Sequence, residues 1–391
     1  MDEKSVKKIK RKSFFSGVIA ALLAIALLYF IYMIFPFSGG ASRPDTIQTI
    51  RKAKEIQRII DRHYLGEINE QDETDTMFVG QVAGLGDPYS RYYTKEEYEK
   101  VLKERKGTYT GIGVTITENT EENMVEVVSV QEDGPADKAG VQKGDLILKV
   151  NGQDVTGKST SEVSDLIEEC VGKEISIDLK RGASGETVSV KVTPGKLETE
   201  TVKSSMLDST TGYIQITEFA QVTVDQFKEA KEQLESQGMQ KMILDLRDNG
   251  GGLVSSACDI GRQILPQGII VYEEDKNGNR TYEKNEEDNG FSMPLVVLIN
   301  ENTASAAEIL AGAIKDDGIG TLVGTTTYGK GIVQNDYRLS DGSVLKLTVK
   351  HYYTPDGNDI HKKGIEPDYE VEAADDGSDP QLEKAKELLA G

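Results

Sequence analysis

The chain has 391 residues, 37% hydrophobic and 28% charged, which is typical of a globular protein with two or three domains. Its net charge of −21 makes nucleic acid a poor partner, so no nucleic-acid binding is expected. The two cysteines, Cys170 and Cys258, form no C-x-x-C pair. We therefore expect two buried free thiols in preference to one disulfide, and neither a metal site nor a cofactor.

The N-terminus combines a basic tail with a long uncharged stretch. Phe14 to Phe35 are 22 residues without a charge, and six of the first twelve residues are basic. That length crosses a bilayer as a helix, so residues 14–37 are predicted to be a transmembrane anchor after a cytoplasmic tail, residues 1–13. The basic flank predicts a body outside the cytoplasm, held at the cell membrane. A cleaved signal peptide is the alternative, although its apolar core is usually only ~7–15 residues long.

Residues 38–99 are predicted to be mainly helical. Isoleucines at helical spacing predict a helix over residues 46–64. Thr94 and Glu97 have the spacing of a capping box, which predicts a second helix over residues 95–103.

A small α+β unit is predicted over residues 100–193, where the apolar pattern changes to alternation. Ser159 and Glu162 have capping-box spacing, so a helix is expected to run from there to near Cys170. The strands expected in this unit are Gly111 to Thr117, Val125 to Val130, Gly144 to Val150, Ile175 to Lys180 and Thr187 to Val192.

Strands and helices alternate over residues 194–375, which predicts an α/β core. Glu274 to Asn289 is expected to be a hydrophilic excursion, and residues 376–391 a linker with a short helix. The expected strands are Gly212 to Phe219, Met242 to Leu246, Ile269 to Glu273, Pro294 to Asn300, Thr321 to Gly324, Gly331 to Tyr337 and Val344 to Tyr352. The expected helices are Asp225 to Gln237, Leu253 to Leu265 and one that follows Ser305.

Ser305 is the first candidate catalytic residue. It lies between a predicted strand and a predicted helix, where its hydroxyl would project beside the N–H groups of the helix start. Such N–H groups can stabilise a developing negative charge. Ser305 and Glu308 also have the spacing of a capping box, so this hexapeptide alone favours a structural cap over a nucleophile.

Lys330, between two glycines, is the candidate base. A free lysine has a pKa near ~10.4, but desolvation can lower it enough to accept a proton from a serine. Gly324 to Lys330 nearly match a phosphate-binding loop, yet Gly331 replaces the Ser or Thr that would hold magnesium, and a strand should follow. The chain has three histidines but no G-x-S-x-G or H-E-x-x-H motif, so histidine-based hydrolysis is disfavoured.

Two glycine-rich turns are candidate binding elements. Gly250 to Gly252 would bring N–H groups close to a substrate carbonyl, although an ordinary strand-to-helix turn explains them equally well. A second turn leads into an edge strand, where consecutive N–H groups can bind the terminal carboxylate of a peptide that adds as a strand. Its residues are Gly111, Ile112, Gly113 and Val114.

Seven stretches, taken in order, resemble the C-terminal processing peptidases, or tail-specific proteases, of the S41 serine peptidase family. Together these matches reverse the preference for Ser305 as a cap. Two details depart from the family pattern: Gly250 stands where proline is frequent, and IEECVG at 167–172 lacks an arginine that many members carry. The stretches are GDPYSRYY (86–93), YTGIGV (109–114), DGPADKAGVQKGDLILKVNG (133–152), LDLRDNGGGL (244–253), NENTASAAEI (300–309), TYGKGIVQ (327–334) and YYTPDGNDIHKKGIEPD (352–368).

The resemblance implies a role for individual residues. Ser305 would be the nucleophile, Lys330 the general base, and Gln334 the group that orients the lysine. The backbone N–H groups of Gly251 and Ala306 would form the oxyanion hole.

The resemblance also implies a fold and a function. The fold would be α/β, with a crotonase/ClpP-like catalytic core, an inserted PDZ domain at 100–193, an N-terminal helical region and one preceding transmembrane helix. We expect a membrane-anchored extracytoplasmic serine endopeptidase that binds the C-terminal tails of protein substrates and cleaves through an acyl-enzyme. A catalytically silent or conditionally activated PDZ scaffold is the alternative, and a homodimer or larger homo-oligomer is a further expectation. The hypothesis of a nucleotide-dependent enzyme would rest only on the near match of Gly324 to Lys330 to a phosphate-binding loop.

Overall fold

The computed structural model describes residue 25 and residues 46–181, 185–287 and 291–390. The chain divides into two units, Met1–Glu70 and Gln71–Gly391. The first unit contains α2 (Thr46–His63), which confirms the helix expected there. The predicted tail and membrane anchor, residues 1–37, lie outside the described residues apart from Ile25. Among the helices that are described, none is both long and apolar enough to cross a membrane.

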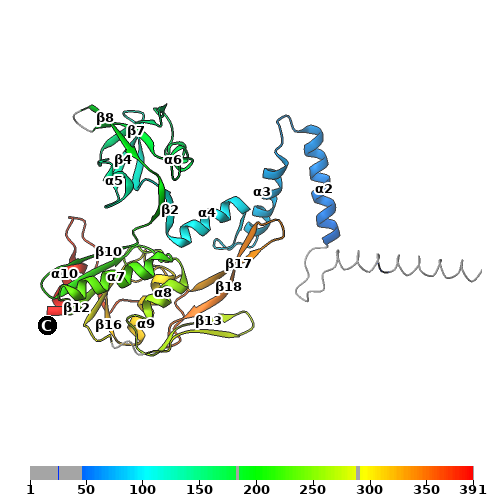
Figure 1. The fold of residues 1–391 in the computed structure, drawn as a ribbon. Helices are drawn as coiled ribbons and strands as arrows, with labels where there is room; N and C mark the ends of the chain where they lie inside the picture. The colour runs from blue at the N-terminus through cyan, green and yellow to red at the C-terminus, as the bar shows by residue number, and fades with distance from the viewer. Residues whose placement is uncertain (1–24, 26–45, 182–184, 288–290, 391) are drawn as a thin grey trace, which may run out of the picture. The chain divides into compact units, whose positions relative to one another are not determined.

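A mostly parallel sheet forms the centre of the second unit (Figure 1). Helices pack on both of its faces, which confirms the predicted α/β class. One edge strand, β10 (Val202–Met206), runs antiparallel to its neighbour, and the other strand pairs are parallel. The strand order is β10 (Val202–Met206), β11 (Thr211–Ile216), β12 (Lys241–Asp245), β15 (Leu295–Ile299), β16 (Gly320–Gly324) and β19 (Tyr369–Glu370).

Burial on both faces explains why these strands are continuously apolar in sequence. Met242 and Leu244 of β12 pack in the cluster that also contains α7 (Val222–Ser236), α8 (Val254–Gly261) and α9 (Ala306–Asp316). Ile243 packs on the opposite face with Ala385 and Leu389 of α10 (Pro380–Ala390). The predicted C-terminal helix therefore docks on the sheet rather than fraying from it.

A second, antiparallel sheet lies in the same unit. The hydrophilic excursion expected over Glu274 to Asn289 contains a strand that was not predicted, because β14 (Arg280–Asn285) forms a hairpin with β13 (Gly268–Asp275). Aromatic contacts stabilise this polar hairpin, since the rings of Tyr272 and Tyr282 lie 5.5 Å apart and Arg280 lies over Tyr272. The strands are β1 (Arg91–Tyr93), β18 (Val344–Tyr353), β13 (Gly268–Asp275) and β14 (Arg280–Asn285), with β17 (Ile332–Arg338) paired to β18.

Two helices precede the small domain in sequence. Helix α3 (Glu70–Ala83) has no apolar stripe and was not predicted individually. Helix α4 (Lys95–Lys106) begins at the predicted capping box, in which the Thr94 hydroxyl and the Glu97 carboxylate accept each other's backbone N–H groups.

The small domain is built on an antiparallel sheet. The predicted capping box of Ser159 and Glu162 starts its helix α6 (Thr160–Glu168). The single strand expected over 111–117 is interrupted, because Gly113 has a φ of 85° that breaks the extended chain. A ladder between β2 (Thr108–Gly111) and β9 (Gly195–Glu198) joins the segments that enter and leave the domain. Its other elements are β3 (Val114–Asn119), β4 (Met124–Val130), α5 (Pro135–Lys138), β5 (Asp145–Val150), β6 (Gln153–Asp154), β7 (Ile175–Arg181) and β8 (Glu186–Val192).

Both cysteines are free thiols, as predicted. Cys258 is buried, and its burial raises the pKa of the thiol to about 12. Cys170 is only half-buried, so the expectation that both thiols are buried holds for one of them.

Four parallel strands of the central sheet, β11, β12, β15 and β16, end at the same edge. The segments that follow them contain Phe219, Gly250 to Gly252, Ser305 and Lys330 respectively. A Cβ on Gly324, where β16 ends, would clash with the Ile299 carbonyl oxygen, so glycine is required for this close approach. The fold thereby gathers the candidate site residues of the core at one edge of one sheet.

Candidate active site

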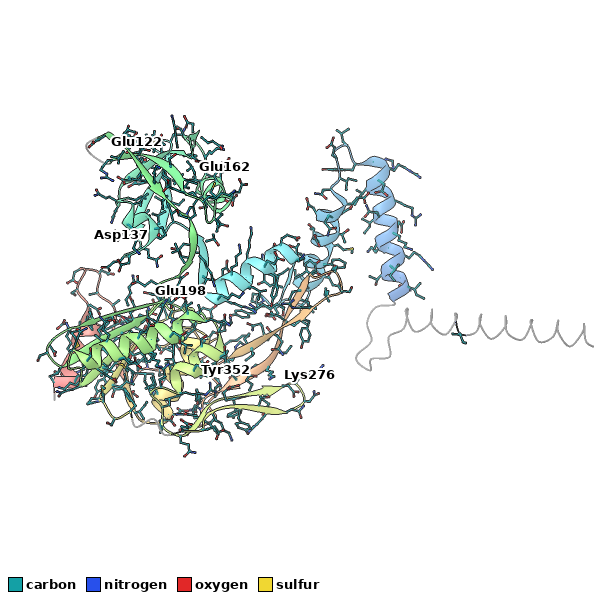
Figure 2. All side chains as sticks on the ribbon, in the orientation of Figure 1. Glu122, Asp137, Glu162, Glu198, Lys276 and Tyr352 are labelled. Carbon is teal, nitrogen blue, oxygen red and sulfur yellow. The ribbon has the colours of Figure 1, made fainter. Side chains whose placement is uncertain are left out.

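Ser305 occupies a strained turn between β15 and α9. Its φ of 56° and ψ of −118° lie in a region that residues with a side chain rarely adopt. Two hydrogen bonds fix the turn: the hydroxyl of buried Tyr352 donates to the Ser305 carbonyl at 3.0 Å, and the Ala304 N–H donates to the Asn249 carbonyl at 2.9 Å. Tyr352 lies on β18 of the second sheet (Figure 2), so both sheets position this turn.

Ser305 and Glu308 form a capping box at the start of α9, as their spacing predicts. The Ser305 N–H donates to the Glu308 carboxylate at 2.8 Å. Ser305 therefore contributes to the cap of the helix, and capping alone does not distinguish a structural serine from a nucleophile.

Glu308 connects the turn at Ser305 to the segment that carries Lys330. This carboxylate is fully buried, and its Oε2 accepts from the N–H groups of Ser305 at 2.8 Å and Lys330 at 2.9 Å. Its Oε1 accepts from the Gly329 N–H at 2.7 Å and the Thr327 hydroxyl at 2.6 Å. Four hydrogen bonds compensate for the burial of the charge. The sequence showed Glu308 only as a capping partner, and this link across 22 residues carries no local signal.

Lys330 lies in a half-buried position beside Tyr89. Desolvation by burial, with a smaller contribution from the positive charge of Lys346, lowers the pKa of Lys330 below its ordinary value. Its Nζ lies 4.8 Å from the centroid of the Tyr89 ring. Over the described part of the chain, no hydrogen bond joins the side chain of Lys330 to Ser305 or to Gln334. The Gln334 amide instead donates to the Thr348 hydroxyl at 3.3 Å.

The strand β17 begins two residues after Lys330, at Ile332. A phosphate-binding loop would open a helix at this point. The expectation that the G-x-x-x-x-G-K match is coincidental is therefore confirmed by the fold.

The residues expected to form an oxyanion hole lie next to Ser305. A Cβ built on Gly251 would be 2.8 Å from the Ser305 Cβ and 2.9 Å from the Ala306 nitrogen, so only glycine fits there. The Ala306 N–H, in the first turn of α9, has no carbonyl within the helix to bind. The Gly251 N–H donates to the Asn249 side chain at 2.8 Å, and an oxyanion would have to replace this bond.

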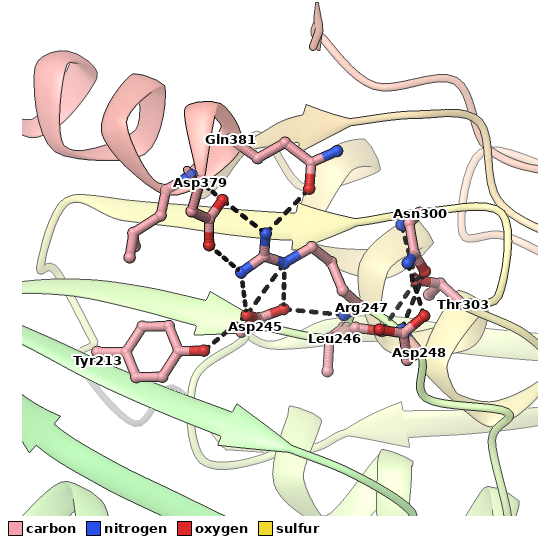
Figure 3. Close-up of polar contacts among 10 residues, drawn as sticks. Tyr213, Asp245, Leu246, Arg247, Asp248, Asn300, Thr303, Asp379 and Gln381 are labelled. Atoms are coloured by element: carbon pink, nitrogen blue, oxygen red, sulfur yellow. Dashed lines mark hydrogen bonds and ion pairs between the residues drawn. The ribbon is translucent and has the colours of Figure 1, made fainter. Parts of the chain in front are cut away.

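A charged cluster that the sequence did not single out supports the loop between β12 and α8 (Figure 3). Arg247 binds Asp245 on the sheet and forms two parallel bonds of 2.8 Å and 2.9 Å with Asp379, just before α10. Gln381 accepts a further bond from Arg247 at 3.0 Å, and the Tyr213 hydroxyl donates to Asp245 at 2.6 Å. The C-terminal helix is thus tied to the loop that leads to Gly251.

Asp248 links the same loop to the segment that precedes Ser305. Its carboxylate accepts from the amides of Asn302 at 2.8 Å and Asn300 at 2.9 Å, and these bonds lower its pKa. The Asp248 N–H donates to the Asn300 side chain at 2.9 Å. These contacts brace the two loops against each other beside the Gly251–Ser305 approach.

The candidate peptide-binding turn lies in the small domain, away from these residues in sequence. The carbonyls of Ile112 and Gly113 accept from the N–H groups of Ala136 and Gln131, each at 2.8 Å, which fixes the turn to the domain. A cavity of about 660 Å³ lies beside α6, and neither Ser305 nor Lys330 lines it. Its lining includes Ile116 of β3 together with Thr160 and Ser164 of α6.

Comparison with known proteins identifies the family. The sequence profile of Peptidase family S41 matches residues 210–371, and that of the PDZ domain matches residues 126–181. The carboxy-terminal processing protease CtpA of Bacillus subtilis is 34% identical over 385 residues, which are 98% of this chain and 82% of that relative. The chain belongs to the S41 family of carboxy-terminal processing proteases.

A second relative agrees with this membership, and a solved structure shares the fold. A carboxyl-terminal-processing protease of Synechocystis is 34% identical over 335 residues, or 83% of this chain and 78% of that relative. The crystal structure of a putative S41 protease from Bacteroides fragilis shares the fold, with a TM-score of 0.52 and 18% identity over 90% of this chain and 99% of that one. This S41 protein is accordingly a serine-type peptidase with a PDZ domain.

Proposed function

We propose that this S41 peptidase cleaves by a Ser–Lys mechanism in which Ser305 is the nucleophile and Lys330 the general base. The observation that carries the proposal is the bridge of Glu308, whose Oε2 binds the backbone N–H groups of both residues. The strained turn that carries Ser305 and the lowered pKa of Lys330 support such a pair.

The chemistry proceeds in two stages. Ser305 Oγ attacks the scissile carbonyl while its proton passes to neutral Lys330, and the tetrahedral intermediate places a negative charge on the former carbonyl oxygen. The C–N bond then breaks, Lys330 returns the proton to the leaving amine, and an ester remains on Ser305. A water molecule, deprotonated by Lys330, attacks this ester and releases the new carboxylate with the free hydroxyl.

Gly251 and Ala306 are proposed to donate their N–H groups to the oxyanion. Both lie against Ser305, but the Gly251 N–H first has to leave the Asn249 side chain. Gln334 is proposed to orient Lys330, after a change of partner from the Thr348 hydroxyl.

The PDZ domain is proposed to capture the free C-terminus of a protein substrate through Gly111, Ile112, Gly113 and Val114. The tail would add as a strand along β3, beside the cavity that α6 lines. An unfolded tail suits this mode, because only an extended peptide can pair with a strand edge.

A conditionally activated enzyme is the second candidate. Two contacts that have to break before catalysis favour this candidate. The amine of Lys330 lies over the Tyr89 ring, and the Gly251 N–H is bound to Asn249. In that case binding of a tail would supply the free energy for the exchange.

The predicted anchor, residues 14–37, supports a place at the outer side of the cell membrane with the catalytic body extracytoplasmic. Self-association as a homodimer or larger oligomer is proposed from α2, where Ile47, Ile50, Ile56 and Ile59 are 46–56% exposed. Alkylation of substituted cysteines from outside intact cells tests the topology, and light scattering of the purified chain tests the assembly.

The mechanism is tested by replacing Ser305 with Ala and following cleavage of a labelled protein that has an unstructured apolar C-terminus. Cleavage should fall at least about 1000-fold, because no other group replaces the nucleophile. Ser255→Ala is the matched control: Ser255 is exposed on α8, and its replacement should leave the rate of cleavage unchanged. Normal cleavage by the Ser305→Ala protein at an unchanged unfolding midpoint would exclude this serine as the nucleophile.

A further inference from the structure

The turn of residues 86–93, GDPYSRYY, places Tyr89 beside the side chain of Lys330 and takes part in none of the bond-breaking steps above. Asp87 shapes the turn, since its carboxylate accepts from the Tyr89 N–H at 3.1 Å and the Ser90 hydroxyl at 2.6 Å. Ser90 in turn accepts from the Thr348 N–H of β18 at 3.1 Å, and β1 continues the attachment by pairing with β18. The turn is therefore held firmly on the strand next to β17, the strand that follows Lys330.

This attachment places the ring of Tyr89 beside the amine of Lys330. The Nζ of Lys330 lies 4.8 Å from the ring centroid, within the range of a cation–π contact. Hydrogen bonding with Tyr328 and burial raise the pKa of Tyr89 to about 12, so the phenol is neutral. Tyr328 follows Thr327, whose hydroxyl binds Glu308, so the ring, the lysine and the Glu308 bridge belong to one local assembly.

A ring in this position attracts the lysine only while the lysine carries its charge. The charged groups that face Lys330 come from three elements: Lys346 of β18 disfavours the ammonium, whereas Glu308 of α9 and Asp87 of the turn favour it. None of the three is removed by a change at Tyr89. The ring can thus be tested separately from the ionic surroundings of the amine.

We propose that Tyr89 is a positioning residue for the base: its ring holds protonated Lys330 away from Ser305 in the free enzyme, and an incoming substrate has to draw the amine off the ring. The proposal rests on the proposed function, in which Lys330 is the base. It predicts that the ring makes deprotonation of Lys330 harder before substrate binds, and that this effect disappears once substrate has displaced the amine.

The test is the pH dependence of peptide cleavage by the full chain, with a fluorogenic peptide that ends in an apolar residue with a free carboxylate. The acidic limb of kcat/KM reports the free enzyme and that of kcat reports the substrate complex. For Tyr89→Leu, the midpoint of the kcat/KM limb should move down by about 0.5–1.5 pH units, while the kcat midpoint stays in place. Tyr89→Phe keeps the ring and loses the bond to Tyr328, so its kcat/KM midpoint should move by less than about 0.3 units.

Three results separate the possibilities. A kcat/KM midpoint that does not move in Tyr89→Leu, or that moves equally in Tyr89→Phe, overturns the role of the ring. A lower plateau rate with unmoved midpoints also overturns it, because that is the result of a packing contact alone. Undiminished cleavage by Lys330→Ala refutes the proposed base itself, and this result is distinct from a failure of the Tyr89 proposal.

Discussion

Replacing Glu308 with Gln should weaken the link between the turn at Ser305 and the segment that carries Lys330. The carboxylate accepts four hydrogen bonds, from the N–H groups of Ser305, Gly329 and Lys330 and from the Thr327 hydroxyl. Glutamine has nearly the same shape, but one of its two terminal atoms is a donor. In either orientation of the amide, at least one buried backbone N–H then faces an NH₂ group.

The size of the effect follows from these contacts. With the amide nitrogen at the Oε1 position, the Gly329 N–H loses its acceptor, and in the other orientation the N–H groups of Ser305 and Lys330 both lose theirs. A buried donor left without a partner costs about 1–3 kcal/mol, and the bonds that remain become weaker because they are no longer charge-assisted. We expect the free energy of unfolding to fall by about 2–4 kcal/mol. A displacement of Ser305 relative to Lys330 should lower kcat by roughly 100-fold.

Urea unfolding and kcat, both measured well below the melting temperature, check this prediction. Glu301→Gln is the matched control: Glu301 precedes Ser305 in the same loop but is exposed, and it accepts a bond from the Thr325 hydroxyl at 3.0 Å. Its effect on stability should stay within about 0.5 kcal/mol. If Glu308→Gln behaves like this control in both measurements, the bridge does not position the two segments.

Two further predictions concern charges around the site. The pKa of Lys330 is lower in the folded protein than in the unfolded chain, so the unfolded chain binds more protons between the folded-state pKa and ~10.4. The free energy of unfolding should therefore rise with pH through this window. Urea unfolding at several pH values checks this, and Lys330→Met should flatten the rise. A slope that is equal in both proteins would contradict the burial of the amine. Asp379→Asn removes one charge from the paired bonds of Arg247 and should cost about 1–2 kcal/mol of unfolding free energy, whereas Asp376→Asn, which alters an exposed turn, should cost less than about 0.5 kcal/mol. Equal losses in these two variants would show that the Arg247 contact does not hold the C-terminal helix.

The position of Ser305 was predictable because its signal is local. A buried apolar strand followed by a short polar turn and a helix places the serine at the edge of an α/β sheet, and the surrounding stretch resembles the S41 family. The sequence could not show how this serine differs from an ordinary cap, since the S-x-x-E spacing of Ser305 and Glu308 is the same as that of Ser159 and Glu162. The difference lies in the backbone: Ser305 has a φ of 56°, whereas Ser159 has an ordinary φ of −71°.

The contacts that the sequence missed join residues far apart in the chain. The Glu308 bridge, the Tyr89–Lys330 contact and the Arg247–Asp379 pair each depend on how separate elements pack. Missed elements of the fold have a related cause. Strand β14 and helix α3 carry few apolar residues at regular spacing, so no periodic pattern marked them, and tertiary contacts such as the Tyr272–Tyr282 pair decide their structure.

The geometry limits what activation would have to change. Glu308 already fixes the backbones of Ser305 and Lys330, so the sheet and its loops need not move. Three contacts separate this arrangement from the proposed competent one. The amine of Lys330 has to leave Tyr89, at about 0.5–2 kcal/mol, while the Gly251 N–H has to leave Asn249 and the Gln334 amide has to leave Thr348, each at about 0.5–1.5 kcal/mol. The total of about 1.5–5 kcal/mol has to come from the difference between the affinities of the tail for the two arrangements. Tight capture by the PDZ domain that is equal in both arrangements would therefore leave the active site unchanged.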